Sequence, residues 1–472
     1  MNKTGYEKLI SVLKPVYLEE KFADAYEKWT GEGHVLSDAE LLKILDRYEL
    51  SPEWINRLTG YLDALRSDPA VTEYMTFVSW IMCDARYTYY IEDKTDFNLT
   101  LIGDPGRTVT FFICLSCVFY AEKDLIRRQI PASLYEDIPH RMLKRQMNKI
   151  MQSDDFFVDD LQWQANFYSL SIYLFDRFLF VPCRFDDPYT FYRRGDEVVG
   201  IADDGLSVDT EGQIILKKEI PSGSEGRTVS NGEISSVTEE AGDIKKADPA
   251  EADVKNGHYY GGFREDRKVS FVTERRENGS EVTGYRISPC GYITDSLITL
   301  DKSEYKQILK RDDWMIGFHI PEGEGYVPAR VRSSMKPAWE FFKKYYPEIP
   351  FKGFWSASWL YDGRLSLLLP DDSNIVRVQR HLFNYSGGWN GEMLYLELYG
   401  DVDMPLEDVP KESSLQKKVA RFLENGGRFC EPGMVYFPEE LDKDHEKMIY
   451  ITPEDLERQD ELFESNGLKG RI

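Results

Sequence analysis

Residues 314–346 read WMIGFHIPEGEGYVPARVRSSMKPAWEFFKKYY and carry the most specific structural signal of the chain. The first seven residues are apolar and aromatic, which is typical of a strand. A glycine loop follows over 320–325. Apolar side chains at helical spacing then predict a helix over 328–346. A loop at a helix N-terminus presents N–H groups without intrahelical partners and the positive end of the helix dipole. The pattern therefore predicts a strand, a candidate anion site and a helix.

The loop from Ile320 to Gly325 has features for and against a phosphate site. Glycine lets the backbone approach a pyrophosphate closely. Glu322 and Glu324 count against the site, because two carboxylates beside a phosphate cost energy unless they point away. On spacing alone, a plain turn is the more frequent role of such a loop.

A set of residues around this loop carries a resemblance to a known family. The matching positions are Trp314, His319–Gly323, Ser334, Phe341, Phe342, Tyr346–Pro347, Ser358–Leu360, Leu369–Pro370, Ser373–Ile375 and Gln379, with Thr283–Tyr285, Ser288–Gly291, Arg128–Pro131 and Phe178–Phe185 upstream. They resemble a bacterial acyltransferase-domain family that has a helical N-acyltransferase N-terminal domain and a GNAT-like C-terminal domain. The similarity is specific over about 280–385 and looser in the N-terminal half.

The resemblance implies a GNAT fold, whose known members transfer an acyl group from coenzyme A to an amine. In that fold the strand before the loop is splayed from its neighbour and admits the pantetheine arm. The usual loop starts with glutamine or arginine, and Ile320 departs from that pattern, while Gly323 and Gly325 match it. The resemblance implies acetyl-CoA or another acyl-CoA as co-substrate, and no metal. The residues it assigns to binding are Ile320, Glu322, Gly323, Glu324, Gly325, Tyr326, Ser373 and Asn374.

Two residues near the loop are candidates for proton transfer. An attacking amine must lose a proton, because a lysine-like amine has a pKa of about 10.4 and only the free amine attacks. His319 ends the predicted strand and is the candidate base. Tyr361 stands near the place where GNAT enzymes often have a tyrosine acid. The alternatives are a structural histidine, a packed aromatic ring and, for Ser373 and Asn374, a turn.

The first 176 residues are expected to form a helical domain. Ser37-Asp38-Ala39-Glu40 is a capping box, in which two side chains satisfy N–H groups of the first turn. Ser51-Pro52 begins another helix with a hydroxyl cap and a proline where no N–H is needed. Further helices are expected after Pro131 and over 163–174.

The rest of the chain is expected to alternate between strands and helices. Residues 177–310 form the β-rich first part of the GNAT-like region and contain a disordered insertion, 217–258, whose Ser, Gly, Glu, Asp, Ala and Lys composition cannot bury enough surface to fold. Residues 311–440 form the GNAT-like C-terminal domain, with one strand expected over 375–383. Residues 441–472 form a charged helical tail. The predicted fold class is α+β with a mixed sheet.

Composition limits the kind of protein. The 58 basic and 82 acidic residues give a formal charge of −24, which argues against nucleic acid or an anionic membrane as partner. No apolar run reaches the roughly 18 residues of a membrane span, and no signal peptide is evident, so we expect a cytoplasmic protein. Six cysteines do not make a disulfide framework. Cys114 and Cys117 form a CxxC within FFICLSCVFY, which indicates a buried helix, with a redox pair as the alternative.

The sequence as a whole favours a GNAT-superfamily N-acyltransferase. It would transfer an acyl group, with acetyl as the first candidate, directly from coenzyme A to a small-molecule or peptide amine. The alternative is an inactive GNAT-like ligand-binding or interaction module, because a fold does not fix a function. No GxSxG elbow, P-loop or HExxH motif is present.

Overall fold

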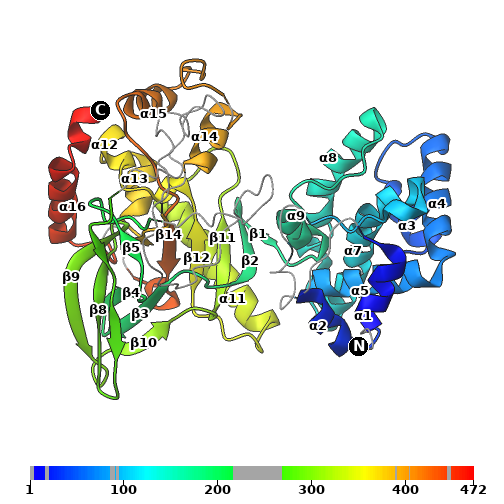
Figure 1. The fold of residues 1–472 in the computed structure, drawn as a ribbon, viewed down its shortest axis with the longest axis horizontal. Coiled ribbons are helices and arrows are strands. Elements are labelled where there is room, and N and C mark those ends of the chain that lie inside the picture. Colours follow the sequence, from blue (N-terminus) through cyan, green and yellow to red (C-terminus); the bar gives the residue numbers. More distant parts are fainter. Residues whose placement is uncertain are drawn as a thin grey trace, which may run out of the picture. The chain divides into compact units, whose positions relative to one another are not determined.

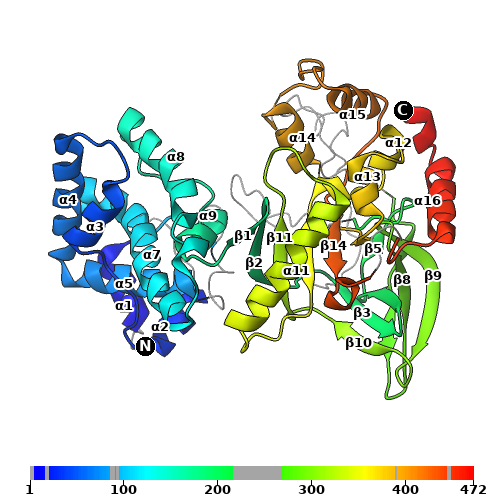
Figure 2. The ribbon, with the colours of Figure 1, turned by 180° about the vertical axis from the view of Figure 1, so that it is seen from behind.

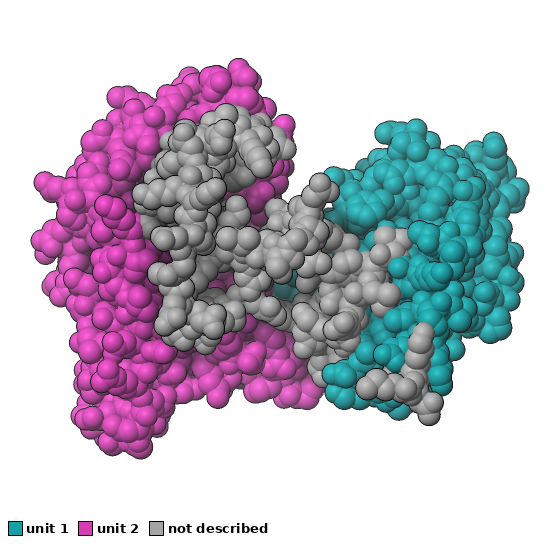
Figure 3. Space-filling model, in the orientation of Figure 1, with its two compact units in different colours: residues 1–174, 179–182 teal, residues 175–178, 183–472 magenta. Residues whose placement is uncertain are grey.

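The computed structural model describes residues 5–15, 21–84, 91, 95–215, 268–388, 391–402, 404–443 and 448–472. The chain divides into two compact units, residues 1–174 with 179–182 and residues 175–178 with 183–472 (Figure 3). The expected insertion at 217–258 lies outside the described residues.

The first unit is helical (Figure 1). Its helices are α1 (Gly5–Leu13), α2 (Lys21–Lys28), α3 (Asp38–Leu45), α4 (Pro52–Arg66), α5 (Pro69–Cys83), α7 (Val109–Arg127), α8 (Ile138–Ser153) and α9 (Leu161–Tyr168), with 3-10 turns η1 (Thr100–Ile102), η2 (Asp104–Thr108) and η3 (Ala132–Leu134). The capping box of Ser37 and Glu40 and the hydroxyl cap of Ser51 are confirmed. The helix expected over 163–174 is too long, because α9 ends at Tyr168.

The CxxC motif lies in α7, the most buried helix of this unit. Cys114 and Cys117 are both fully buried. The Cys83 thiol donates a hydrogen bond to the Cys117 carbonyl, with 3.6 Å between sulfur and oxygen. Burial raises the pKa of the Cys114 thiol, so the reactive thiolate is disfavoured. The buried-helix prediction is confirmed. No helix in the described ranges is both long enough and apolar enough to cross a membrane.

The second unit contains two larger sheets (Figures 1 and 2). The first includes β11 (Trp314–His319), β12 (Phe354–Ala357), β14 (Gly433–Tyr436) and β13 (Phe383–Tyr385), neighbours in that order. The second has the order β10 (Lys306–Leu309), β3 (Tyr189–Arg194), β4 (Glu197–Ala202), β8 (Glu281–Ser288) and β7 (Arg275–Glu277), and β9 (Tyr292–Asp301) also pairs with β8. Strands β5 (Ser207–Val208) and β6 (Phe271–Val272) pair separately, and β1 (Tyr173–Phe175) and β2 (Phe178–Arg184) hold residues of both units.

The helices of this unit follow β11 along the chain. They are α11 (Pro328–Tyr345), η4 (Trp359–Tyr361), α12 (Leu365–Leu368), α13 (Asn374–Gln379), α14 (Glu392–Tyr399), α15 (Ser414–Glu424), η5 (Pro438–Glu440), α16 (Pro453–Ser465) and η6 (Leu468–Arg471). The strand expected over 375–383 is wrong. Ser373 accepts the Val376 N–H at 3.4 Å and starts a short helix, and only Phe383 belongs to a strand. A short apolar run fits either element, and here the cap decides.

The first sheet is covered on both faces. On one face α11 packs its apolar side, with the rings of Trp339 and Phe354 6.1 Å apart. On the other face Met315 and Val435 join a core with Phe191 and Ile287 from the second sheet. Because side chains alternate along a strand, each residue of β11 and β12 is assigned to one of these two faces.

Candidate functional site

The site lies where the parallel strands β11 and β12 diverge. Their pairing ends at Gly317 and Trp355, although β11 continues to His319 and β12 to Ala357. Strand β12 stays paired with β14 as far as Ala357 and Gly433, so the gap opens on the β11 side of β12. The splay that the resemblance implies is therefore present. The diverging edges offer backbone groups to which the amides of an extended ligand can bond.

The glycine loop closes the end of this fork. Gly323 has φ 119° and Gly325 has φ 96°, in the region that residues with a Cβ rarely adopt. No N–H group from Glu322 to Tyr326 donates a hydrogen bond to any described group. The loop therefore presents several N–H groups immediately before α11, which begins at Pro328. These are the groups that an anion needs.

Arg177, in the turn before β2, binds the loop from outside. Its Nη1 donates to the Gly323 carbonyl at 2.8 Å, and its Nη2 donates to the Pro321 carbonyl. Because the guanidinium holds these carbonyls, it fixes the loop and places a positive charge beside it. Sequence analysis missed Arg177, which precedes Gly323 by 146 residues. The loop starts with Ile320, where the usual pattern has glutamine or arginine, and Arg177 places a cation beside the loop from another part of the chain.

A second guanidinium, that of Arg330, also approaches the loop backbone. Arg330, in the first turn of α11, donates from Nε to Asp176 Oδ2 at 2.7 Å. A Cβ placed on Gly325 would lie only 2.2 Å from Arg330 Nη1, so this side chain touches the loop backbone. Hydrogen bonding to Arg330 lowers the pKa of the Asp176 carboxyl. Glu322 and Glu324 are both exposed.

Two tyrosine hydroxyls meet beside the fork. Tyr326 ends the loop, packs its ring 6.5 Å from that of Phe178, and directs its hydroxyl toward Tyr361. Tyr361 ends η4 and is fully buried, with Ser356 of β12 on its other side. Burial raises the pKa of both phenols. The two hydroxyls face each other, and Tyr361 also faces Ser356, but no described residue meets either hydroxyl at hydrogen-bond geometry.

His319 ends β11, one residue before the loop. Alternation along the strand places it on the face of Met315, opposite α11. Burial lowers the pKa of the imidazole to about 4. The ring is therefore neutral near pH 7 and holds an added proton weakly.

The structure places Ser373 and Asn374 at the start of α13. Ser373 caps α13, and Asn374 is the exposed first residue of that helix. No described contact joins either residue to the loop.

The buried carboxylate of Asp187 binds the side chain of Trp355 in β12. Asp187 Oδ2 accepts hydrogen bonds from Trp355 Nε1 at 2.7 Å and from the Tyr385 hydroxyl at 2.5 Å. Burial raises the pKa of Asp187. Because two donors already bind this oxygen, its role is to hold the Trp355 ring in place.

Two further carboxylates, those of Glu431 and Glu392, lie within electrostatic reach of each other near the start of β14. Glu431 stands two residues before β14, and the neighbouring Pro432 carbonyl accepts the Ser358 N–H at 3.1 Å, just past the end of β12. Burial and the charge of Glu392, at the start of α14, raise the pKa of Glu431 to about 7. No sequence motif marks either residue.

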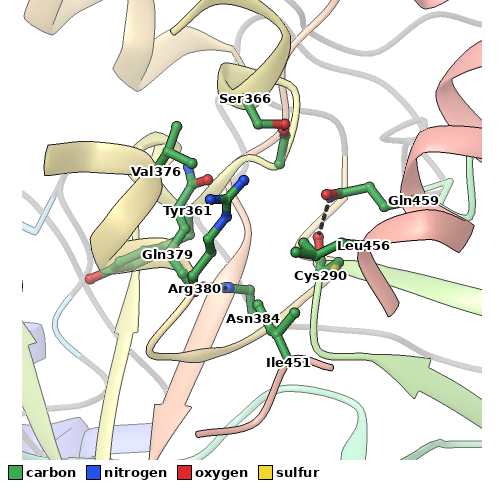
Figure 4. A pocket seen from close by; sticks show the side chains of 11 residues that line it. Cys290, Tyr361, Ser366, Val376, Gln379, Arg380, Asn384, Ile451, Leu456 and Gln459 are labelled. Atoms are coloured by element: carbon green, nitrogen blue, oxygen red, sulfur yellow. Dashed lines mark hydrogen bonds between the residues drawn. The ribbon is translucent and has the colours of Figure 1, made fainter. Parts of the chain in front are cut away.

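A separate small cavity lies behind Tyr361 (Figure 4). Its volume is about 20 Å³, and its lining includes Cys290, Gln379, Arg380 and Asn384. Gln459 Nε2 closes one side by donating to the Cys290 carbonyl at 3.2 Å. A water needs about 10–15 Å³, so this space holds one water and no acyl chain. In the described ranges, no group of three or more His, Cys, Asp or Glu side chains is placed to hold a metal ion.

Comparison with known families identifies the second half of the chain. Residues 263–434 match the family model of the GNAT-like C-terminal domain. This chain therefore contains a GNAT-like C-terminal domain, which confirms that part of the resemblance, and a helical unit precedes it.

Solved structures similar to the chain are acyltransferases. One, in complex with decanoyl-CoA, has 14% identity and a TM-score of 0.48, over 92% of this chain and 99% of its own. A variant in complex with octanoyl-CoA has 13% identity and a TM-score of 0.47, over 91% and 98%. A complex with decanoyl-CoA and teicoplanin has 14% identity and a TM-score of 0.46, over the same shares. No curated protein matches the chain.

Proposed function

We propose that this protein is a coenzyme-A-dependent acyltransferase that acylates an amine. The observation that carries the proposal is the fork between β11 and β12, which leads directly to the loop of Gly323 and Gly325 within a GNAT-like domain. An extended pantetheine arm fits between diverging strand edges, because its amides can bond to their backbone groups.

The loop suits the pyrophosphate of coenzyme A. Its N–H groups and the positive end of α11 attract negative charge. Arg177 and Arg330 add two guanidinium groups, of which Asp176 neutralises one. Glu322 and Glu324 oppose binding only weakly, because both side chains are exposed and solvent screens their charges.

The proposed reaction is direct transfer without a covalent enzyme intermediate. The amine attacks the thioester carbonyl, the C–N bond forms, and the C–S bond breaks. Backbone N–H groups at the open edge of the fork stabilise the oxyanion as charge develops. Tyr361 donates its phenolic proton to the departing thiolate, and the position of its hydroxyl beside Ser356 of β12 and Tyr326 of the loop suits this role. His319, as a neutral imidazole, forms hydrogen bonds with the acceptor.

The first test is calorimetric binding of acetyl-CoA, octanoyl-CoA and free CoA to the wild type and to Gly323→Asp with Gly325→Asp. We expect micromolar binding by the wild type and at least about a tenfold loss in the variant, because the new carboxylates occupy the anion site and neither position tolerates a Cβ. Gly279→Asp, in an open turn far along the chain from the loop, is the matched control and is expected to bind normally. A folded wild type that binds no CoA at millimolar concentration would contradict the proposal and favour an interaction module.

Arg177→Met is expected to weaken CoA binding about tenfold, since a charge-assisted contact near the pyrophosphate contributes roughly 1.5 kcal/mol. The control is Arg184→Met in the same strand hairpin, whose guanidinium donates to the Asp312 carbonyl at 2.7 Å rather than to the loop. Calorimetry at two salt concentrations measures CoA binding by both variants and by the wild type. We expect the CoA affinity of the wild type to fall more steeply with salt than that of Arg177→Met, which lacks one cation. Equal affinities for the two variants would exclude a role for Arg177 at the phosphate site.

A further inference from the structure

The carboxylate of Asp176, in the turn between β1 and β2, holds two of the three nitrogens of the Arg330 guanidinium. Arg330 Nε donates to Asp176 Oδ2 at 2.7 Å, and Arg330 Nη2 donates to Oδ1 of the same carboxylate. A pair with two parallel hydrogen bonds fixes the plane of the guanidinium as well as its position. Because a long side chain loses rotamer freedom when it binds a ligand, a guanidinium that is already held in place binds an anion at a smaller entropic cost.

The third nitrogen of this guanidinium, Nη1, lies against the glycine loop. A Cβ placed on Gly325 would be 2.2 Å from Arg330 Nη1 and 3.5 Å from Arg177 Cδ. Among the described residues, none accepts a hydrogen bond from Arg330 Nη1. The Arg330 side chain is 44% exposed, so an anion from solvent can reach it. The pair with Asp176 therefore leaves one guanidinium nitrogen beside Gly325 to bind an anion.

Arg177, the other guanidinium at the loop, is engaged differently. Its Nη1 and Nη2 donate to the carbonyls of Gly323 and Pro321. Its guanidinium also lies over the Phe178 ring, with 5.3 Å between Cζ and the ring centroid. Arg177 therefore fixes the shape of the loop and adds charge, whereas Arg330 keeps a nitrogen for direct contact with a ligand.

The arrangement offers more than one position for an anion. The N–H groups of the loop and the positive end of α11 suit one phosphate group. Arg330 adds a cation at Gly325, which is the end of the loop that leads to α11 rather than the end that leaves β11. A diphosphate has two linked anionic groups and fills both positions, whereas a single phosphate fills only one.

We propose that Asp176 is a positioning residue that holds Arg330 at the loop, and that Arg330 binds the second phosphate of coenzyme A, the one next to the adenosine. The inference rests on the proposed acyl transfer from coenzyme A. It makes this ion pair the feature that selects coenzyme A over a phosphopantetheine arm with a single phosphate, such as a carrier protein bears. It also reverses the effect expected from charge alone. A carboxylate near an anion site repels the anion, yet removal of Asp176 weakens binding because it releases Arg330.

Calorimetry with coenzyme A, 3′-dephospho-coenzyme A and 4′-phosphopantetheine tests the assignment. The first variant is Asp176→Gly. The φ of Asp176 is 56°, which glycine adopts without strain, so this change removes the carboxylate and keeps the turn. We expect about a tenfold loss of affinity for coenzyme A and for its dephospho form, and less than about a twofold change for phosphopantetheine. Arg330→Met should show the same pattern, and adding Asp176→Gly to it should cause no further loss.

The matched control is Asp442→Gly, which removes an exposed carboxylate that pairs with Lys336 of the same helix at 2.5 Å. Its three affinities should equal those of the wild type. Equal losses for all three probes in Asp176→Gly would show that Asp176 only maintains the loop, and unchanged or tighter binding of coenzyme A would show that it does not position Arg330. A loss confined to coenzyme A would place Arg330 at the 3′-phosphate.

Each of these three results would overturn the inference and leave the proposed function intact, because the wild type still binds coenzyme A. A folded wild type that binds no coenzyme A would instead overturn the proposed function, and this inference with it.

Discussion

Arg364→Met is expected to lower the free energy of unfolding of the second unit by about 3–5 kcal/mol. The Arg364 side chain is 4% exposed and lies between the buried carboxylates of Glu211, 9% exposed, and Asp362, 0% exposed. Its Nη2 is 2.8 Å from Glu211 Oε2, and its Nη1 is 3.0 Å from Asp362 Oδ1. Removal of the cation leaves two carboxylates buried without their partner, and desolvation makes this costly.

Denaturant unfolding of the full chain, followed by a probe in the second unit, measures the loss of unfolding free energy in Arg364→Met. The control is Arg380→Met, which breaks a partly exposed ion pair with Asp371 and should cost under about 1 kcal/mol. Adding Glu211→Gln and Asp362→Asn to Arg364→Met should recover much of the loss, because the uncompensated charges are then gone. A loss below about 1 kcal/mol for Arg364→Met would mean that solvent reaches the three side chains.

The elements around the candidate site were predictable because their signals are local. The strand over 314–319 and the helix from Pro328 follow from apolar periodicity and from a proline at the first helical position. The glycines of the loop have positive φ, which no other residue adopts easily, so their spacing reports the backbone conformation directly. The α+β fold class, which is confirmed, was predictable from the same kind of local signal.

What the sequence could not predict depends on contacts between distant segments. Arg177 reaches Gly323 across 146 residues, and its position in a turn before β2 gives no sign of that contact. Glu431 is one of 82 acidic residues, and only sheet pairing brings it to the end of β12. The alternation of Val376 and Val378 with polar residues predicts a strand over Asn374–Gln379, but the Ser373 cap starts a helix there.

Glu431→Gln is expected to make the protein more stable at alkaline pH by about 3 kcal/mol, with little effect near pH 4. The folded-state pKa of Glu431 is raised from 4.5 to about 7, so between these pH values the native state binds more protons than the unfolded state. Stability of the wild type therefore falls as pH rises from about 4.5 to 7, at about 1.36 kcal/mol per unit of pKa difference. Glutamine does not ionise, so the variant escapes this loss. Denaturant unfolding at pH 4.5, 6 and 8 measures the difference.

Denaturant unfolding of Glu392→Gln at the same three pH values tests what raises the pKa of Glu431. The substitution removes the like charge but leaves the burial, which is the larger cause, so it should recover only a minor part of the gain at pH 8. A stability difference between Glu431→Gln and the wild type that is the same at all three pH values would show that the carboxyl ionises normally. A carboxylate that destabilises its own fold at working pH is the pattern expected of a group retained for function, because active sites keep charges that packing alone would remove.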